Sequence, residues 1–158
     1  MLNIYLFNWI KFIIIKTASF NILKKNEDIK GAVSIALFPS NFNDVKFEYK
    51  ALAPNWKILD KFKKKIISEE KFILAYKDQL NELNPNNIMD HLSFLTGGIE
   101  PIIMCHCGKT KFCHRHLLAD WLETQLGIRI EEFDSPDHIR KEGYLIKRKE
   151  PSLFKEED

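Results

Sequence analysis

The sequence predicts an α/β protein of three layers, with a mainly parallel sheet that carries helices on both faces. Two observations lead to this class. Continuous apolar runs, typical of buried parallel strands, come early in the chain at Phe12–Thr17 and Ala32–Phe38. Segments with apolar residues at helical spacing then alternate with further strand-like runs, as in parallel sheets covered by helices.

The first predicted strand, Phe12–Thr17, overlaps an apolar N-terminal stretch, Met1–Ile15. Asn3, Asn8 and Lys11 interrupt this stretch, and no small-residue cleavage pattern follows it. No uninterrupted apolar run approaches the roughly 18 to 20 residues that a membrane-spanning helix requires. We therefore expect a strand here and no membrane partner.

Two further strands are expected before the helical part of the chain. Ala32–Phe38 is a continuous apolar run that ends at Pro39, which cannot donate a backbone hydrogen bond. Val45–Tyr49 alternates apolar and polar residues, a pattern typical of a half-exposed edge strand. Leu52–Trp56, around Pro54, is interpreted as an irregular turn.

Three helices follow. The first is predicted over Trp56–Ile67, with a lysine-rich face that we interpret as exposed to solvent. The second begins after Ser68, whose hydroxyl can cap free backbone amides, and stops before Pro85. The third covers Asn87–Leu95 and ends near Gly97.

The last predicted elements surround a cluster of polar residues. A strand at Ile99–Met104 precedes the cluster, and a helix at Arg115–Leu126 follows it, with Gly127 as a fitting C-cap. Ile128–Phe133 alternates and is predicted as the final strand, at a sheet edge.

Length and composition limit the class of protein. The 158 residues fit a single α/β domain at 1–150, followed by a disordered tail at 151–158. A formal net charge of +2 does not by itself indicate a nucleic-acid or membrane partner. An odd number of cysteines, three, argues against a disulfide framework and favours free thiols in a reducing cytoplasm.

One window carries the chemistry of the chain. All three cysteines and three of the five histidines lie between Ile102 and Leu118. Polar residues at the carboxyl end of a buried strand, just before a helix, lie where open α/β sheets form their ligand crevices. We therefore expect the functional site at Cys105–Arg115, and we expect His91 and His138 to be ordinary surface or core residues.

The first interpretation of this window is an anion site. The free amides and the dipole of a helix N-terminus attract anions, and Arg115 offers a planar fork suited to phosphate. Gly108 allows close backbone approach, Lys109 adds positive charge, and His116 completes the predicted ligand-binding set. The expected ligand is a phosphate-bearing or nucleotide-like small molecule, or nucleic acid. In the alternative, Arg115 pairs with an acidic residue of its own protein.

The second interpretation is catalysis by Cys113 and His114. A thiol just before a helix, next to a histidine and an arginine, is in a setting that lowers its pKa and favours a reactive thiolate. The cysteine phosphatase loop, Cys-x5-Arg, has another spacing, because Cys107 and Cys113 stand eight and two residues before Arg115. A buried, inert cysteine is the alternative.

The third interpretation is a zinc site. Cys105, Cys107 and Cys113, with one histidine of the window, offer four soft ligands. Structural zinc more often uses a Cys-x2-Cys pair than the Cys-x-Cys found here. In this rival hypothesis the protein is a non-enzymatic module that interacts with nucleic acid or protein through its basic segment Arg140–Lys149.

At these residues the chain resembles a widespread bacterial family of uncharacterised small α/β proteins. The shared features are an apolar strand ending in a cysteine-containing turn, Ile103-Met104-Cys105, then Cys113-His114-Arg115 opening a helix with paired leucines. The resemblance covers about Ile99–Phe133, and Leu52-Ala53-Pro54 resembles a turn found midway in that family. It implies the α/β fold and leaves the activity open.

Overall fold

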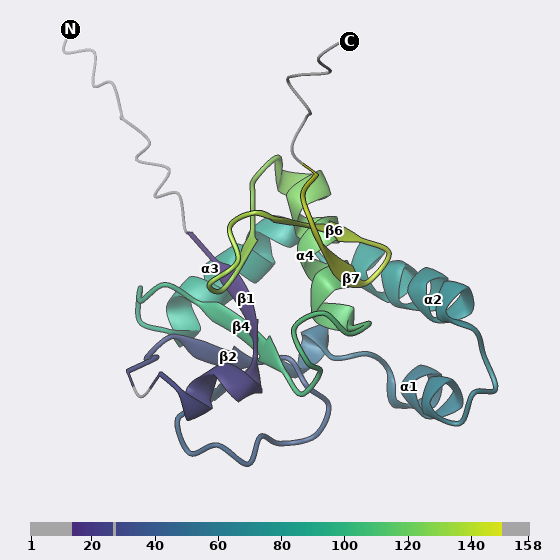
Figure 1. Cartoon of the computed structure of the whole chain (residues 1–158), viewed down its shortest axis with the longest axis horizontal. Coiled ribbons are helices and arrows are strands. Elements are labelled where there is room, and N and C mark those ends of the chain that lie inside the picture. Colours follow the sequence, from purple (N-terminus) through teal and green to yellow (C-terminus); the bar gives the residue numbers. More distant parts are fainter. Residues whose placement is uncertain (1–13, 27, 150–158) are drawn as a thin grey trace, which may run out of the picture.

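The fold is built on a five-stranded parallel sheet (Figure 1). The computed structural model describes residues 14–26 and 28–149. The strands lie in the order β3-β2-β4-β1-β5, and all neighbouring pairs are parallel. Their bounds are Lys16–Ser19 (β1), Ala32–Ser34 (β2), Phe47–Glu48 (β3), Ile102–Cys105 (β4) and Glu131–Glu132 (β5). The predicted α/β class with a parallel sheet is confirmed.

Strand β4 lies at the centre of the sheet and determines where the site forms. All four of its residues are buried, as expected for a continuous apolar run covered on both faces. Its register pairs Met104 with Ala18 of β1 and with Ser34 of β2, and Cys105 with Ser19. The carboxyl ends of three parallel strands therefore meet around Cys105.

Four α-helices pack on the sheet, with two short 3-10 turns before them. Ser68 caps α2, because its Oγ accepts a hydrogen bond from the Lys71 amide at 3.3 Å. Gly127 caps α4 with a left-handed φ of 64°. Both predicted caps are confirmed. The helices are Trp56–Lys63 (α1), Glu69–Asn81 (α2), Pro85–Leu95 (α3) and His114–Leu126 (α4), and the 3-10 turns are Phe20–Lys24 (η1) and Lys50–Leu52 (η2).

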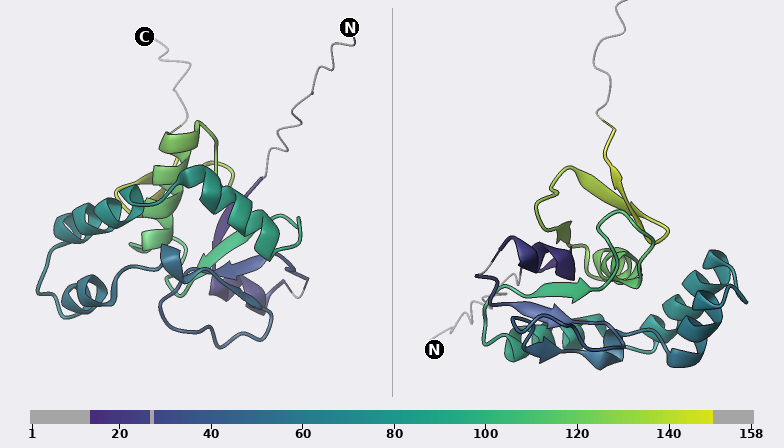
Figure 2. Two further views of the ribbon diagram at one scale, coloured as in Figure 1. Left: turned by 180° about the vertical axis from the view of Figure 1, so that it is seen from behind. Right: turned by 60° about the horizontal axis from the view of Figure 1, so that its bottom comes forward.

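The layers are visible in the right panel of Figure 2, where α4 lies on one side of the sheet and α3 on the other. Helix α2 contacts α4, and α1 contacts α2 further out. The turn at Leu52-Ala53 is held by α2, since Tyr76 Oη donates to the Leu52 carbonyl at 2.6 Å and Gln79 Nε2 donates to the Ala53 carbonyl at 2.7 Å. The irregular turn predicted around Pro54 thus anchors the helical layer to the sheet.

Two expected elements are shorter than predicted. Helix α1 ends at Lys63 rather than Ile67, because Lys65 adopts a left-handed φ of 56° that no α-helix continues. Strand β2 ends at Ser34 rather than Phe38. The chain leaves the sheet there, and the Ile35 carbonyl lies 3.0 Å from His114 at the start of α4.

The edge strand predicted at Ile128–Phe133 is present but shorter, and it is not the last strand of the chain. Only Glu131 and Glu132 pair, as the edge strand β5, and a separate antiparallel hairpin follows at His138–Lys141 (β6) and Tyr144–Lys147 (β7). Its two-residue turn has positive φ at Glu142 (48°) and Gly143 (85°), as tight hairpin turns require.

The hairpin closes over the start of α4. The Cys113 amide donates to the Gly143 carbonyl at 2.9 Å. A Cβ atom on Gly143 would lie 2.5 Å from the Phe112 ring, so only glycine allows this approach.

The N-terminal part of the first predicted strand, before Ile14, and the predicted tail at 151–158 lie outside the described residues. Within residues 14–26 and 28–149, no helix has both the length and the apolarity to cross a membrane.

Candidate functional site

The site lies where the carboxyl end of β4 meets the N-terminus of α4. Cys105 is the last residue of β4, and Cys113 is the N-cap of α4. The Cys113 thiol accepts a hydrogen bond from the Arg115 amide at 3.4 Å, so a sulfur takes the capping role that serine or aspartate usually has. The fold thus brings together two cysteines that are eight residues apart.

The thiols form a small cluster. The Sγ atoms of Cys105 and Cys113 are 2.8 Å apart and share a hydrogen bond, and both side chains are buried. Cys107 lies beside them but is only partly buried. The neighbouring thiols of Cys105 and Cys113, together with the positive charges of Arg115 and Lys63, hold the pKa of Cys107 well below its usual range.

The pKa shifts of Cys107 and Cys113 have opposite directions, and the one for Cys113 disfavours the thiolate that the sequence predicts there. Burial raises the pKa of Cys113 well above its usual value, and its hydrogen bond to Cys105 raises it further. A helix N-terminus and an arginine favour a thiolate, but they do not outweigh complete burial.

Arg115 is fully buried, and every donor group of its side chain contacts the protein itself. Its Nη2 and Nε donate to Glu132 at 2.8 Å and 3.3 Å in a bidentate pair. Its Nη1 donates to Cys105 Sγ at 3.1 Å and to the Cys107 carbonyl at 3.0 Å. Nη2 also reaches the carbonyls of Gly108 and Lys109 at 3.4 Å and 3.3 Å. Arg115 therefore pairs with an acidic residue of its own protein, as in the second of the two interpretations of the sequence.

Glu132 is the residue that sequence reasoning missed. It is buried on β5, and its Oε2 accepts a hydrogen bond from Thr17 Oγ1 at 2.6 Å. Arg140 of β6 approaches the same carboxylate, with its Nη2 at 3.9 Å, and also donates to Thr17 Oγ1. One carboxylate thus serves two buried guanidinium groups, which join the thiol cluster to the C-terminal hairpin.

His114 is oriented by a backbone carbonyl. Its Nε2 lies 3.0 Å from the Ile35 carbonyl and must donate to it, so in the neutral ring Nδ1 carries the lone pair. Burial lowers the pKa of His114 and favours this neutral form. Nδ1 lies 3.9 Å from Cys113 Sγ, where it can accept the proton of that thiol.

His116 holds the turn after β4 together with Arg115. Its Nε2 donates to the Lys109 carbonyl at 3.0 Å, and its buried Nδ1 has no hydrogen-bond partner among the described residues. Burial and the charges of Arg115 and Arg140 lower the pKa of His116 to about 3. The side chain is therefore neutral at ordinary pH.

The titration of His116 leads to a prediction about stability. Because its folded-state pKa lies below the unfolded value near 6.5, the unfolded chain binds more protons between about pH 3 and 6.5. The stabilising contribution is present above this window and is lost as the pH falls through it, at about 1.4 kcal/mol per pH unit. Urea unfolding at several pH values should show this slope in the wild type and a smaller one in His116→Gln. Equal slopes would contradict the buried, neutral histidine.

Three donor atoms of the cluster are close enough to share a metal ion. Cys105, Cys113 and His114 each offer one atom, all within 4.8 Å of one another. Cys107, part of the predicted zinc set, does not belong to this group. Tetrahedral zinc with bonds of about 2.3 Å keeps its sulfurs roughly 3.8 Å apart, so the two thiols would have to separate.

The exposed edge of the thiol cluster, called the mouth of the site below, carries positive charge. Cys107 and Gly108 are partly exposed, and Lys109 and Lys111 are exposed on the same turn. Lys63 at the end of α1 lies over the Phe38 ring, 5.2 Å from its centroid, and is near enough to Cys107 to lower the pKa of its thiol. The two histidines expected to lie outside the site are away from the thiols, His91 against Tyr49 Oη at 2.8 Å and His138 on the C-terminal hairpin.

The fold and the site define a three-layer α/β protein with a buried Cys/His/Arg cluster at the carboxyl end of its central strand. A family model described as the active DUF488-N3 subclade, DUF488-N3a, matches residues 15–126, which are 112 of the 158 residues. The chain belongs to this family. The match includes the thiol cluster and Arg115 but ends before Glu132 and Arg140. Neither a search of curated proteins nor a search of solved structures finds a match.

Proposed function

We propose that this chain is an enzyme that binds a phosphate-bearing, nucleotide-like ligand at the Cys/His/Arg cluster, with the thiolate of Cys107 as the reactive group at the ligand. The observation that carries the proposal is the position of Cys107. It is the partly exposed member of a group of three thiols, and Arg115 and Lys63 stabilise its negative charge.

The other residues of the cluster have supporting roles in this proposal. Cys113 and the partly buried His114 form a pair in which the neutral imidazole can take and return a proton. Arg115 and His116 hold the carbonyls of the turn that carries Cys107 and Gly108. These contacts fix the turn and keep Cys107 at the mouth of the site.

The phosphate of the ligand would bind at the lysine-rich mouth. Arg115 is already paired with Glu132, so the cations left for a ligand are those of Lys63, Lys109 and Lys111. Gly108 has no side chain to obstruct a ligand close to the backbone. Three free thiols support a cytoplasmic location, where such thiols stay reduced.

A second candidate function is a zinc-stabilised interaction module. The metal-compatible spacing of Cys105, Cys113 and His114 favours it. Against it, Arg115 donates to Cys105 Sγ, and Arg140, the first residue of the basic segment at 140–149, has only 4% of its side chain exposed. About one zinc per chain after purification without added metal would favour the module over the enzyme.

The ligand-binding part of the proposal is tested with a panel of nucleoside mono- and triphosphates. We expect at least one of these nucleotides to raise the melting temperature of the wild type. Lys63→Gln should lower the affinity for that nucleotide by about tenfold, as expected for the loss of one charge-assisted contact. Lys30→Gln is the matched control, because Lys30 is exposed just before β2, at the opposite end of the sheet. Equal weakening by both variants would contradict a phosphate at this mouth.

A further inference from the structure

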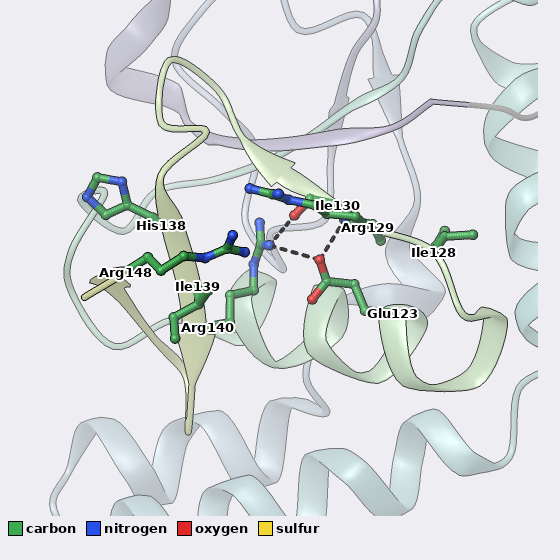
Figure 3. A pocket seen from close by; sticks show the side chains of 8 residues that line it. All are labelled: Glu123, Ile128, Arg129, Ile130, His138, Ile139, Arg140 and Arg148. Carbon is green, nitrogen blue, oxygen red and sulfur yellow. Dashed lines mark hydrogen bonds and ion pairs between the residues drawn. The ribbon is translucent and has the colours of Figure 1, made fainter. Parts of the chain in front are cut away.

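A pocket lies between the C-terminal part of α4 and the hairpin, away from the thiol cluster (Figure 3). It has a volume of about 270 Å³. Three arginines and one glutamate line it, Arg129, Arg140, Arg148 and Glu123, together with isoleucines that include Ile128 and Ile139. The lining therefore carries two more positive than negative charges.

The guanidinium groups of the three arginines point toward one another in Figure 3. Arg140 is the best anchored, because it donates to the Ile130 carbonyl and pairs with Glu123 at 3.6 Å. Glu123 Oε1 in turn accepts from the Ile130 amide at 2.7 Å. This arrangement holds one cation rigidly at the base of the pocket.

Part of the hydrogen-bonding capacity of these arginines is unused. Arg140 Nε is buried and has no partner among the described residues, although only 4% of that side chain is exposed. Arg148 forms no ion pair within the described part of the chain. Arg129 forms an exposed ion pair with Glu131 at 3.5 Å and donates from Nη2 to the Pro136 carbonyl. The unpaired charge of Arg148 and the unused donor of Arg140 favour an anion between these side chains.

We propose that this pocket binds the phosphate group of a phosphomonoester. Three convergent guanidinium groups suit a phosphomonoester, which carries a charge of about −1.5 to −2 near neutral pH and three strong acceptor oxygens, better than a carboxylate with a single charge. The volume is close to the lower end, roughly 300 Å³, of small-molecule sites, so a phosphate and a small organic group fit. Ile128 and Ile139 offer that group an apolar wall.

This site goes beyond the proposed function, because its residues differ from those of the thiol mouth. It is nevertheless joined to the thiol cluster, since Arg140 and Arg115 share Glu132. Apart from Glu123, all residues that line the pocket lie beyond residue 126, where the match to the family model ends.

Binding is tested by titrating the full-length chain with inorganic phosphate, a nucleoside monophosphate, and a short oligonucleotide with and without a terminal phosphate. We expect the phosphorylated probes to bind to the wild type, and Arg148→Gln to lower their affinity by about tenfold. Arg148 is exposed, so this variant should fold normally. Lys147→Gln removes a neighbouring charge that does not line the pocket, and we expect it to bind as the wild type does.

The probes also separate the sources of the phosphate. Preference for the nucleoside monophosphate indicates a small phosphomonoester, and preference for the phosphorylated over the unphosphorylated oligonucleotide indicates a nucleic-acid end. Equal losses of affinity in Arg148→Gln and Lys147→Gln would overturn the inference. Binding that only Lys63→Gln weakens would also overturn it, but would leave the proposed function standing.

Discussion

Replacing Glu132 with glutamine is expected to lower the free energy of unfolding by about 3 to 5 kcal/mol, the typical cost of breaking a buried ion pair. The carboxylate neutralises Arg115 through a bidentate pair and approaches Arg140, and its side chain is only 2% exposed. The amide keeps the shape but removes the charge, so two guanidinium groups remain buried with too little compensation. Urea unfolding of the wild type and the variant measures the difference.

Glu131 provides the matched control for this experiment. It is the adjacent residue of β5, and its carboxylate pairs with Arg129 at 3.5 Å with 39% of the side chain exposed. Exposed ion pairs contribute about 0 to 1 kcal/mol, so Glu131→Gln should change stability little. If both variants lost the same stability, Glu132 would not be the centre of a buried network.

The second large effect concerns the reactivity of Cys107. Iodoacetamide should modify Cys107 before the other two thiols, and its rate should change little between about pH 7 and pH 5, because the pKa of this thiol is held below that range. An ordinary cysteine loses about tenfold in thiolate per pH unit below its pKa, hence about 100-fold over the same interval. Peptide mass spectrometry at each pH measures the site and the rate.

The variants Cys107→Ser and Cys113→Ser control the alkylation experiment. Cys107→Ser should remove the pH-insensitive reaction. Cys113→Ser should keep a reactive Cys107, although one of the neighbouring thiols is lost. Fast alkylation of Cys113 in the wild type at low pH would show that the exposed and buried thiols have been assigned the wrong roles.

The position of the site could be predicted from the sequence because the signals were local. A continuous apolar run ending at Cys105, followed by a helical pattern from Arg115, is enough to place a crevice at the end of a central strand. The caps Ser68 and Gly127 are equally local, and both are confirmed.

The partners of Arg115 could not be predicted, because they depend on long-range packing. Glu132 looks like one of two adjacent acids on an alternating edge strand, and only strand pairing with β1 turns it inward beside Thr17. Arg140 reaches Thr17 across 123 positions of sequence. The hairpin had a weak signal in Glu142-Gly143 between two alternating segments, which we interpreted only as basic and polar.

The sequence also could not predict which of the two thiols, Cys107 or Cys113, has the lower pKa. Both lie in the same electropositive window, and burial decides which of them ionises. Burial of Cys113 follows from packing beneath the hairpin, an element that the sequence reasoning did not expect.

The central claim is that one thiol of the cluster is ionised at neutral pH and accessible to a ligand. Its most direct test is a pH titration of the ultraviolet absorbance of the thiolate, on protein treated with a metal chelator, for the wild type and Cys107→Ser. We predict one thiolate already present at neutral pH, lost on acidification and missing in Cys107→Ser. Absorbance that rises only above about pH 8, as for ordinary cysteine, would mean three neutral thiols and would contradict the account.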